Sequence, residues 1–474
     1  MDDNVMQVLK MLQEGKISAQ EAETLIAALR GESAGPTPTD PSETAKEEKE
    51  DKSFLGGFDF EKIKAPKVDF ESLGDRISKA VAKIQPDKIV KRVQAQVRTA
   101  TRSGAHWGTT VSTRMRTWTD GEDTRPTNRH ELPEHSETHE QEFHLDPEAS
   151  VLIENPLGDV KVIGITEGPA SVVIRKLAWC ARSEEVKAAA AKMEINMHGT
   201  DARLDIKVSA PDTFRDGTVD IELRVPANVG NVRVNAHFGA VEIYEIAGQA
   251  EAVTTTGELN LHDLAGDVRA ETTSGDLKLS RIAGTAKVAT QTGDIAAEHI
   301  GRGLSAIAAS GDVRALDVEG GRVEVKSVSG DAYLERAGLQ SPVDIAVESI
   351  SGDATLKEAH GGIVLKAVSG DIHAEALTAT RLQAQTVSGD VSVRLSEPFS
   401  STMQVNTVSG DVTIGLPDGS NVRVSLATSS GELRCEHDAH DVTALETLWS
   451  GQIGTGAGTL NVQTISGHTH IQHA

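Results

Sequence analysis

Eight aspartates follow glycine turns at nearly constant spacing, and they are the residues of this chain best suited to chemistry. They are Asp276, Asp294, Asp312, Asp331, Asp353, Asp371, Asp390 and Asp411. If the turns stack in register, these carboxylates form a ladder whose neighbouring charges repel, and a divalent cation between rungs would relieve the repulsion. Alternatively, an aspartate in a turn accepts hydrogen bonds from nearby backbone N–H groups. We favour this second interpretation and predict no cofactor and no resident metal.

Two groups of histidines are the other candidates for metal binding. They are His130, His135, His139 and His144, and then His468, His470 and His473. The first group does not have the spacing of a zinc-protease helix, because His144, the histidine after the His139-Glu140 pair, stands one position too late. His468 and His470 would share one face of a strand and could bind a metal weakly, but we favour solvated polar side chains there.

No arrangement of residues predicts a catalytic nucleophile. The chain has no Gly-x-Ser-x-Gly elbow and no phosphate-binding loop ending in Gly-Lys-Ser/Thr. The serines of the Ser-Gly-Asp turns recur in nearly identical surroundings, which argues against an active site. A carbohydrate-active β-helix enzyme would need a cleft with converging carboxylates, and the aromatic content of 3% offers few residues to line one. We therefore predict that the protein is not an enzyme.

The turns that carry the aspartates form an internal repeat from about residue 236 onward. Gly239, Gly257, Gly275, Gly293 and Gly311 follow one another at a constant interval. The repeat continues at Gly330, Gly352, Gly370, Gly389, Gly410, Gly431 and Gly467. The last interval is twice as long, and we interpret it as two successive units. A fixed period this short predicts a solenoid.

Between the turns, apolar and polar residues alternate as in strands with one buried face. Val268 and Ala270 would point inward, whereas Arg269 and Glu271 would point outward. A further set of glycines, Gly248, Gly266 and Gly284, divides each unit into two equal halves. We predict a mainly β fold, a single-chain β-solenoid (β-helix) over 236–474 with coils of about 18 residues. A small α-helical N-terminal region would precede it.

The charge of the chain is unevenly distributed. The formal net charge is −24, yet residues 76–118 hold ten Lys or Arg and one acidic residue, a net of +9. The rest of the chain therefore carries −24 − 9 = −33. The overall balance argues against nucleic acid as a partner. The two cysteines favour a reducing compartment.

Two features bear on where the protein is found. No stretch is apolar enough for a transmembrane helix, and the N-terminus lacks the basic and apolar regions of a secretory signal peptide. We expect a cytoplasmic protein, peripheral at the inner face of the membrane.

The N-terminal third divides into segments of different composition. Residues 1–31 predict a helical hairpin whose apolar residues would bind a partner, a second copy or another part of this chain. These residues are Leu9, Leu12, Leu25 and Leu29. Residues 32–60 predict a disordered linker. Residues 121–140 predict a polar linker, and 141–235 a β-rich entry module with one short helix at 184–193.

Residues 61–120 predict a basic amphipathic helical segment. Its candidate contact residues are Lys88, Lys91, Arg92, Arg98, Arg102, Trp107 and Trp118. Basic residues beside tryptophans are typical of helices that lie in an anionic membrane interface. Docking on the acidic solenoid or on a partner protein is the alternative.

The Ser-Gly-Asp turns and the ending Leu460-Asn-Val-Gln-Thr-Ile-Ser-Gly467 resemble the bacterial "putative adhesin" β-strand-repeat family over residues 141–474. The stretch from Val8 to Ile26 resembles the SHOCT-like helical domain of LiaX/YvlB-type envelope-stress proteins. The resemblance implies a non-enzymatic, adhesin-like scaffold or binding protein linked to envelope stress, with no catalytic residues. A self-assembling, polymer-forming β-helix is the alternative, and a carbohydrate-active enzyme is a remote one.

Overall fold

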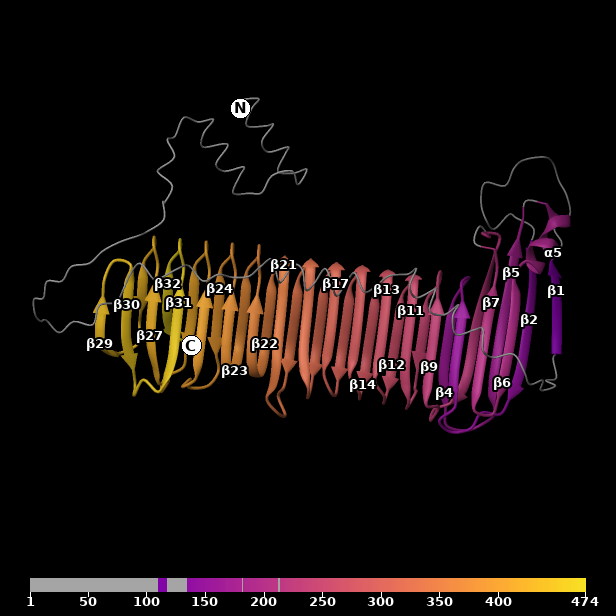
Figure 1. Cartoon of the computed structure of the whole chain (residues 1–474), viewed down its shortest axis with the longest axis horizontal. Coiled ribbons are helices and arrows are strands. Elements are labelled where there is room, and N and C mark those ends of the chain that lie inside the picture. Colours follow the sequence, from indigo (N-terminus) through magenta and orange to yellow (C-terminus); the bar gives the residue numbers. More distant parts are fainter. Residues whose placement is uncertain (1–109, 117–133, 181, 212–213) are drawn as a thin grey trace, which may run out of the picture. The chain divides into compact units, whose positions relative to one another are not determined.

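The computed structural model describes residues 110–116, 134–180, 182–211 and 214–474 (Figure 1). The hairpin predicted at 1–31, the linker at 32–60 and most of the basic segment at 61–120 lie outside the described residues, as do all the contact residues predicted in them. Within the described part, no helix is long and apolar enough to cross a membrane.

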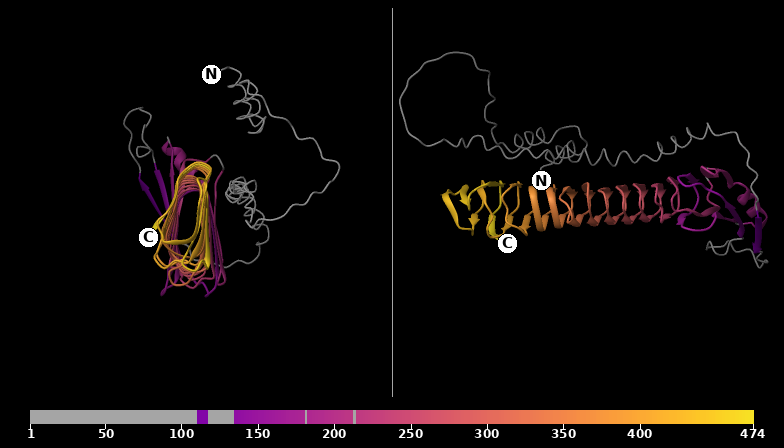
Figure 2. Two further views of the ribbon diagram at one scale, coloured as in Figure 1. Left: turned by 90° about the vertical axis from the view of Figure 1, so that its left-hand side faces the viewer. Right: turned by 90° about the horizontal axis from the view of Figure 1, so that it is seen from below.

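The repeat folds into a β-solenoid, as predicted. Each coil contributes one strand to each of two parallel sheets, and a strand pairs with the strand one coil later. Leu259 is in register with Leu277, and Leu277 with Ile295, at the interval predicted from the glycine turns. Figure 2 shows the coils stacked along one axis, with the two sheets facing each other.

The strands divide into two sets. The first sheet contains β4 (Val160–Ile165), β10 (Val241–Tyr244), β12 (Leu259–Leu264), β14 (Leu277–Ile282), β16 (Ile295–Ile300), β18 (Val313–Val318), β20 (Ala332–Ala337), the first halves of β22 (Ala354–Lys366) and β23 (Ile372–Gln385), β24 (Val391–Leu395) and β26 (Val412–Leu416). The second contains β3 (Ser150–Asn155), β9 (Asn231–Ala236), β11 (Gln249–Thr256), β13 (Val268–Ser274), β15 (Ala286–Thr292), β17 (Leu304–Ser310), β19 (Arg322–Ser329), β21 (Val343–Ser351), the second halves of β22 and β23, and β25 (Thr402–Asn406).

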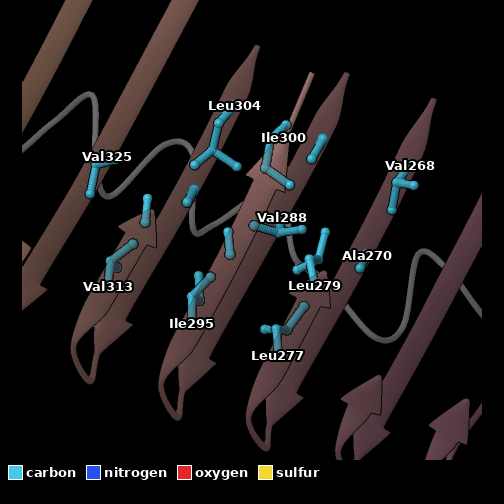
Figure 3. Close-up of a cluster of buried hydrophobic side chains, with 14 of the residues drawn as sticks. Val268, Ala270, Leu277, Leu279, Val288, Ile295, Ile300, Leu304, Val313 and Val325 are labelled. Atoms are coloured by element: carbon cyan, nitrogen blue, oxygen red, sulfur yellow. The ribbon is translucent and has the colours of Figure 1, made fainter. Parts of the chain in front are cut away.

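The core is a narrow layer of aliphatic side chains between the two sheets. Val268, Leu277, Val288 and Ile295 point into it and are almost fully buried (Figure 3). Burying such a side chain stabilises the fold by roughly 1.5–3 kcal/mol. Small and β-branched residues suit this layer because each coil leaves little depth between its sheets. The predicted inward and outward positions are confirmed.

The turn glycines are required by the close approach of successive coils. Gly389 has φ of 150°, and a Cβ placed on it would lie 2.1 Å from the carbonyl oxygen of Gly370 in the preceding coil. Just inside the same corner, Ser349 and Thr386 donate their hydroxyls to the carbonyl oxygens of Gly330 and Gly370, at 3.1 and 3.3 Å. Thus a buried hydroxyl and a glycine together fix the spacing of the coils.

The solenoid begins earlier than the boundary at residue 236 that we predicted. β3 and β4 already form a coil, because β3 pairs in parallel with β9 and β4 with β10. The chain then continues on one side of this coil, where it forms β5 (Ala170–Trp179), α5 (Ser183–Ala191), β6 (Glu194–Thr200), β7 (Arg203–Ser209) and β8 (Gly217–Pro226), and it crosses to the other side at β9. β8 and β5 extend the first sheet, while β7 and β6 extend the second.

Two further predictions are corrected near the N-terminal end of the stack. Residues 134–143 form strand β2 (Glu134–Phe143) instead of ending a polar linker, and 110–116 form strand β1 (Thr110–Arg116) instead of a helix. β2 lies antiparallel between β1 and β5. β2 has few apolar residues that would mark it as a strand in the sequence. A cross-strand ion pair helps to hold it, with Lys176 Nζ 3.5 Å from the Glu137 carboxylate. β-branched residues in β1 favour the strand.

The order of the coils at the C-terminal end was also wrongly predicted. The chain forms β27 (Val422–Ala427), β28 (Leu433–Cys435) and the hairpin of β29 (Ala439–Ala444) with β30 (Leu448–Ile453), and then returns as β31 (Gly458–Gln463) and β32 (Thr469–His473). β31 lies between β25 and β27, and β32 between β26 and β28. The last coil in sequence is therefore inserted before the preceding one.

Candidate binding surface on the Ser-Gly-Asp edge

The aspartates after the turn glycines bind the backbone of the next coil. The carboxylate oxygen Oδ1 of Asp371 accepts the N–H of Asp390 at 2.7 Å, and Asp390 accepts the N–H of Asp411 at 2.8 Å. The same bond joins Asp276 to Asp294 and continues through Asp312, Asp331 and Asp353. This is the hydrogen-bonding role that we favoured from the sequence. Cation binding between the rungs stays the alternative that we did not favour.

A row of aliphatic side chains runs beside this ladder on the outer surface of the second sheet. We call it the aliphatic stripe, and it consists of Val328, Ile350, Val368, Val387, Val408 and Ile465. Each stands immediately before a Ser-Gly turn, in adjacent coils. From Ile350 onward, the serine N–H of one coil donates to the carbonyl oxygen of the stripe residue in the coil before. The first five are half-buried, and Ile465 is 39% exposed.

The stripe follows from the alternation within each strand. Ser349 points inward, so the next residue, Ile350, must point outward, and the same holds for Ser327 and Val328. Charged residues border the stripe on its other side, where Lys326 Nζ lies 2.6 Å from Glu324 and 2.8 Å from Glu348. The edge therefore offers an apolar line between a carboxylate ladder and a row of paired charges.

The opposite corner of the coils carries a second ladder that we did not predict. Asp263, Arg281, His299, Asp317 and Arg336 occupy equivalent positions and all have φ of 54–57°. Arg281 binds Asp263 in the preceding coil, and Arg336 Nη2 donates to Asp317 Oδ2 at 2.9 Å. The hydrogen bonds from Arg281 and Arg336 hold the pKa of the Asp263 and Asp317 carboxyls below their usual range. The sequence signal that could have predicted this ladder is the recurrence of charged residues at the interval of the turn glycines.

Two hollows lie at the N-terminal end of the stack. The first, of about 230 Å³, is mostly apolar and is lined by β2, β5, β6 and β7, including Phe143, Ile174 and Met197. The second, of about 410 Å³, contains Asp159 and Asp220. Both of these carboxylates accept backbone N–H groups, from Ala240 at 2.8 Å and from Asp159 at 3.1 Å. They therefore act as turn-stabilising groups in the same way as the ladder aspartates.

His130 lies outside the described residues, and the other histidines of the two groups are not brought together as units. His135 and His139 lie near Glu137, at 2.9 and 3.9 Å. His470 binds Glu436 at 3.0 Å, and the ring nitrogen Nδ1 of His468 accepts the N–H of Glu432 at 3.0 Å. His473 instead lies near Asp418 and His437, which come from two other segments.

Part of the solenoid has recognisable relatives. Residues 300–406 match the Toastrack DUF4097 family. The Toastrack match extends from the end of β16 to the end of β25 and so contains much of the aliphatic stripe. Residues 3–34 match the SHOCT-like domain, in agreement with the resemblance noted for the N-terminal region. No curated protein matches this chain.

Solved structures with similarity to this chain include three proteins from other organisms. A "putative cell adhesion protein" of Clostridium sporogenes has 10% identity and a TM-score of 0.16, with 71% of this chain and 99% of that chain covered. A "putative adhesin" of Bacteroides fragilis has 11% identity and a TM-score of 0.17, with 70% and 96% covered. A "putative lipid binding protein" of Parabacteroides distasonis has 12% identity and a TM-score of 0.20, with 71% and 97% covered.

Proposed function

We propose that this protein is a non-enzymatic, adhesin-like scaffold that binds a protein along the aliphatic stripe and acts at the cell envelope. The observation that carries the proposal is the stripe itself, six aliphatic side chains in adjacent coils beside a ladder of carboxylates. Each Å² of apolar surface that stays in water forgoes about 25 cal/mol of stabilising free energy. A contiguous apolar row bordered by charged residues is typical of a binding surface. The stacked coils hold that row rigid.

The N-terminal segments would supply the connections to partner and membrane. The SHOCT-like match supports a small helical domain there, and we propose that Leu9, Leu12, Leu25 and Leu29 contact a partner or a second copy. We further propose that the basic residues of 61–120 bind the anionic inner face of the membrane. A link to envelope stress is the biological setting that this arrangement suggests.

Cell fractionation tests the membrane part of the proposal. Deletion of 61–120 also removes strand β1, so the sharper variant changes Lys88, Lys91, Arg92, Arg98 and Arg102 to Gln in the full chain. We expect the wild-type protein to sediment with membranes and the variant to stay in the supernatant. If both proteins are found in the supernatant, the segment does not bind the membrane.

Site-specific photo-crosslinking tests the stripe. A photoreactive amino acid at Val387 should capture a discrete partner in cells, whereas the same group at Ser392, on the outer surface of the other sheet, should not. Both positions face outward and Ser392 is the more exposed of the two, so weaker capture there would not result from burial. Equal capture at the two positions, or none at Val387, would contradict binding along the stripe.

One observation favours self-assembly as a second candidate function. β29 pairs only with β30 among the described strands, so its other edge has unpaired backbone groups. Val442 and Leu445, next to this edge, are 49% and 55% exposed. If copies join there, purified protein should form filaments that are absent from a Val442→Lys, Leu445→Lys variant. A discrete small oligomer in both would favour the scaffold.

A further inference from the structure

The inserted C-terminal coil brings together three side chains that are far apart in sequence. Asp418 follows β26, His473 ends β32 and His437 follows β28. Because β32 lies between β26 and β28, these residues occupy three neighbouring coils. One ligand atom from each lies within 4.8 Å of the other two.

The backbone around the three residues is fixed. Asp418 stands in a Pro-Asp-Gly turn that is closed by the Ser420 hydroxyl, which donates to Pro417 O at 2.7 Å. The N–H of Ala474, next to His473, donates to Leu416 O at 3.0 Å. The N–H of Glu436, next to His437, donates to Ile471 O at 2.9 Å. Strand pairing thus places all three side chains without help from a ligand.

The side chains are also oriented. His473 Nδ1 lies 2.8 Å from Asp418 Oδ1. The rings of His437 and His473 have centroids 4.1 Å apart. His437 Nε2 lies 3.2 Å from Gln472 O, and because a carbonyl can only accept, this nitrogen carries the proton. A backbone carbonyl that fixes the imidazole in this way is a common feature around metal-binding histidines.

We propose that Asp418, His437 and His473 form a site for a divalent transition-metal ion of the zinc class, and that the ion pins the inserted coil to both of its neighbours. Two imidazoles and one carboxylate suit zinc or cobalt better than calcium or magnesium, which prefer oxygen ligands alone. Tetrahedral ligation at about 2.0–2.2 Å would need the side chains to adjust, because its ligand atoms stand farther apart than the 2.8 Å between His473 Nδ1 and Asp418 Oδ1. It leaves a fourth position for water.

Cobalt titration of the full-length, untagged protein tests the site, because tetrahedral cobalt has a visible absorption band. We expect the variants His437→Ala, His473→Ala and Asp418→Asn to bind cobalt at least tenfold more weakly than the wild type does. The matched control is His470→Ala, on the same strand but paired with Glu436, and it should bind as the wild type does. Asp418 is in an exposed turn (87% exposed side chain), so its asparagine variant should keep the fold. Equal cobalt bands in the wild type and in Asp418→Asn, or no band in either, would overturn the site.

Hydrogen exchange tests the pinning separately. Zinc should slow amide exchange in β31 and β32 of the wild-type protein and leave exchange in β14 and β16 unchanged. In Asp418→Asn, zinc should have no effect on either pair. Zinc binding without added protection of β31 and β32 would show that the ion does not pin the coil.

Discussion

Replacing Gly389 with alanine should be among the most damaging single changes in the solenoid. The new Cβ would lie 2.1 Å from Gly370 O, so the two coils must separate. A non-glycine residue at this φ costs about 1–3 kcal/mol. Separation also weakens two bonds between the coils, Gly370 N–H to Ser388 O and Asp390 N–H to Asp371 Oδ1, at 3.0 and 2.7 Å. Each is worth about 1 kcal/mol, so we expect a total loss of about 3–5 kcal/mol.

Gly168→Ala is the control that separates the two causes. Gly168 also has positive φ, 104°, but a Cβ there meets no atom within 4 Å. It should therefore cost only the backbone strain, about 1–3 kcal/mol. Urea unfolding followed by circular dichroism measures both variants. If they lose the same stability, the close approach of the coils does not explain why glycine occupies these turns.

Three further predictions concern the ladders and a half-buried thiol. Asp371→Ala should lose about 1–2 kcal/mol of unfolding free energy in urea, whereas Asp371→Asn keeps an acceptor and should stay near the wild type; stabilisation of the wild type by calcium, absent in Asp371→Asn, would instead support the cation ladder. The lowered pKa of Asp317 means that its contribution to stability is present above the pKa of the unfolded chain, near 4, and is lost as the pH falls through the folded value. The melting temperature of the wild type should therefore fall more steeply below pH 4 than that of Asp317→Asn, and parallel curves would argue against it. Burial raises the pKa of the Cys435 thiol, so its alkylation, followed by peptide mass spectrometry, should need a higher pH in the folded protein than in the urea-unfolded protein, and equal pH profiles in the two states would contradict the burial.

The sequence predicts the coils well because each coil repeats the same local rule. Alternation identifies inward residues such as Val268, and the glycine interval gives the register. The order of the last coils could not be predicted in this way. Gly431 and Gly467 end equivalent turns, and the local pattern does not say which of them stacks on Gly410. The choice depends on pairing between strands that are far apart in sequence, such as β25 with β31 and β26 with β32.

The candidate sites were predicted unevenly for the same reason. The ladder aspartates share one motif with their turns, so their backbone role could be inferred from the sequence. β2 is held in part by an ion pair with β5, and its own residues hardly mark it as a strand. Asp418, His437 and His473 meet only because β32 is inserted, so no spacing in the sequence relates them.

The inserted coil also constrains how the protein is made. The ribosome synthesises the chain from the N-terminus to the C-terminus, so β25 to β30 emerge before β31 and β32 have been made. During that interval the place between β26 and β28 has no strand to fill it, and two sheet edges stay unpaired. The end of the solenoid therefore closes only after residues 458–473 have been synthesised. Until then the nascent chain exposes strand edges that can capture another molecule or need the protection of a chaperone.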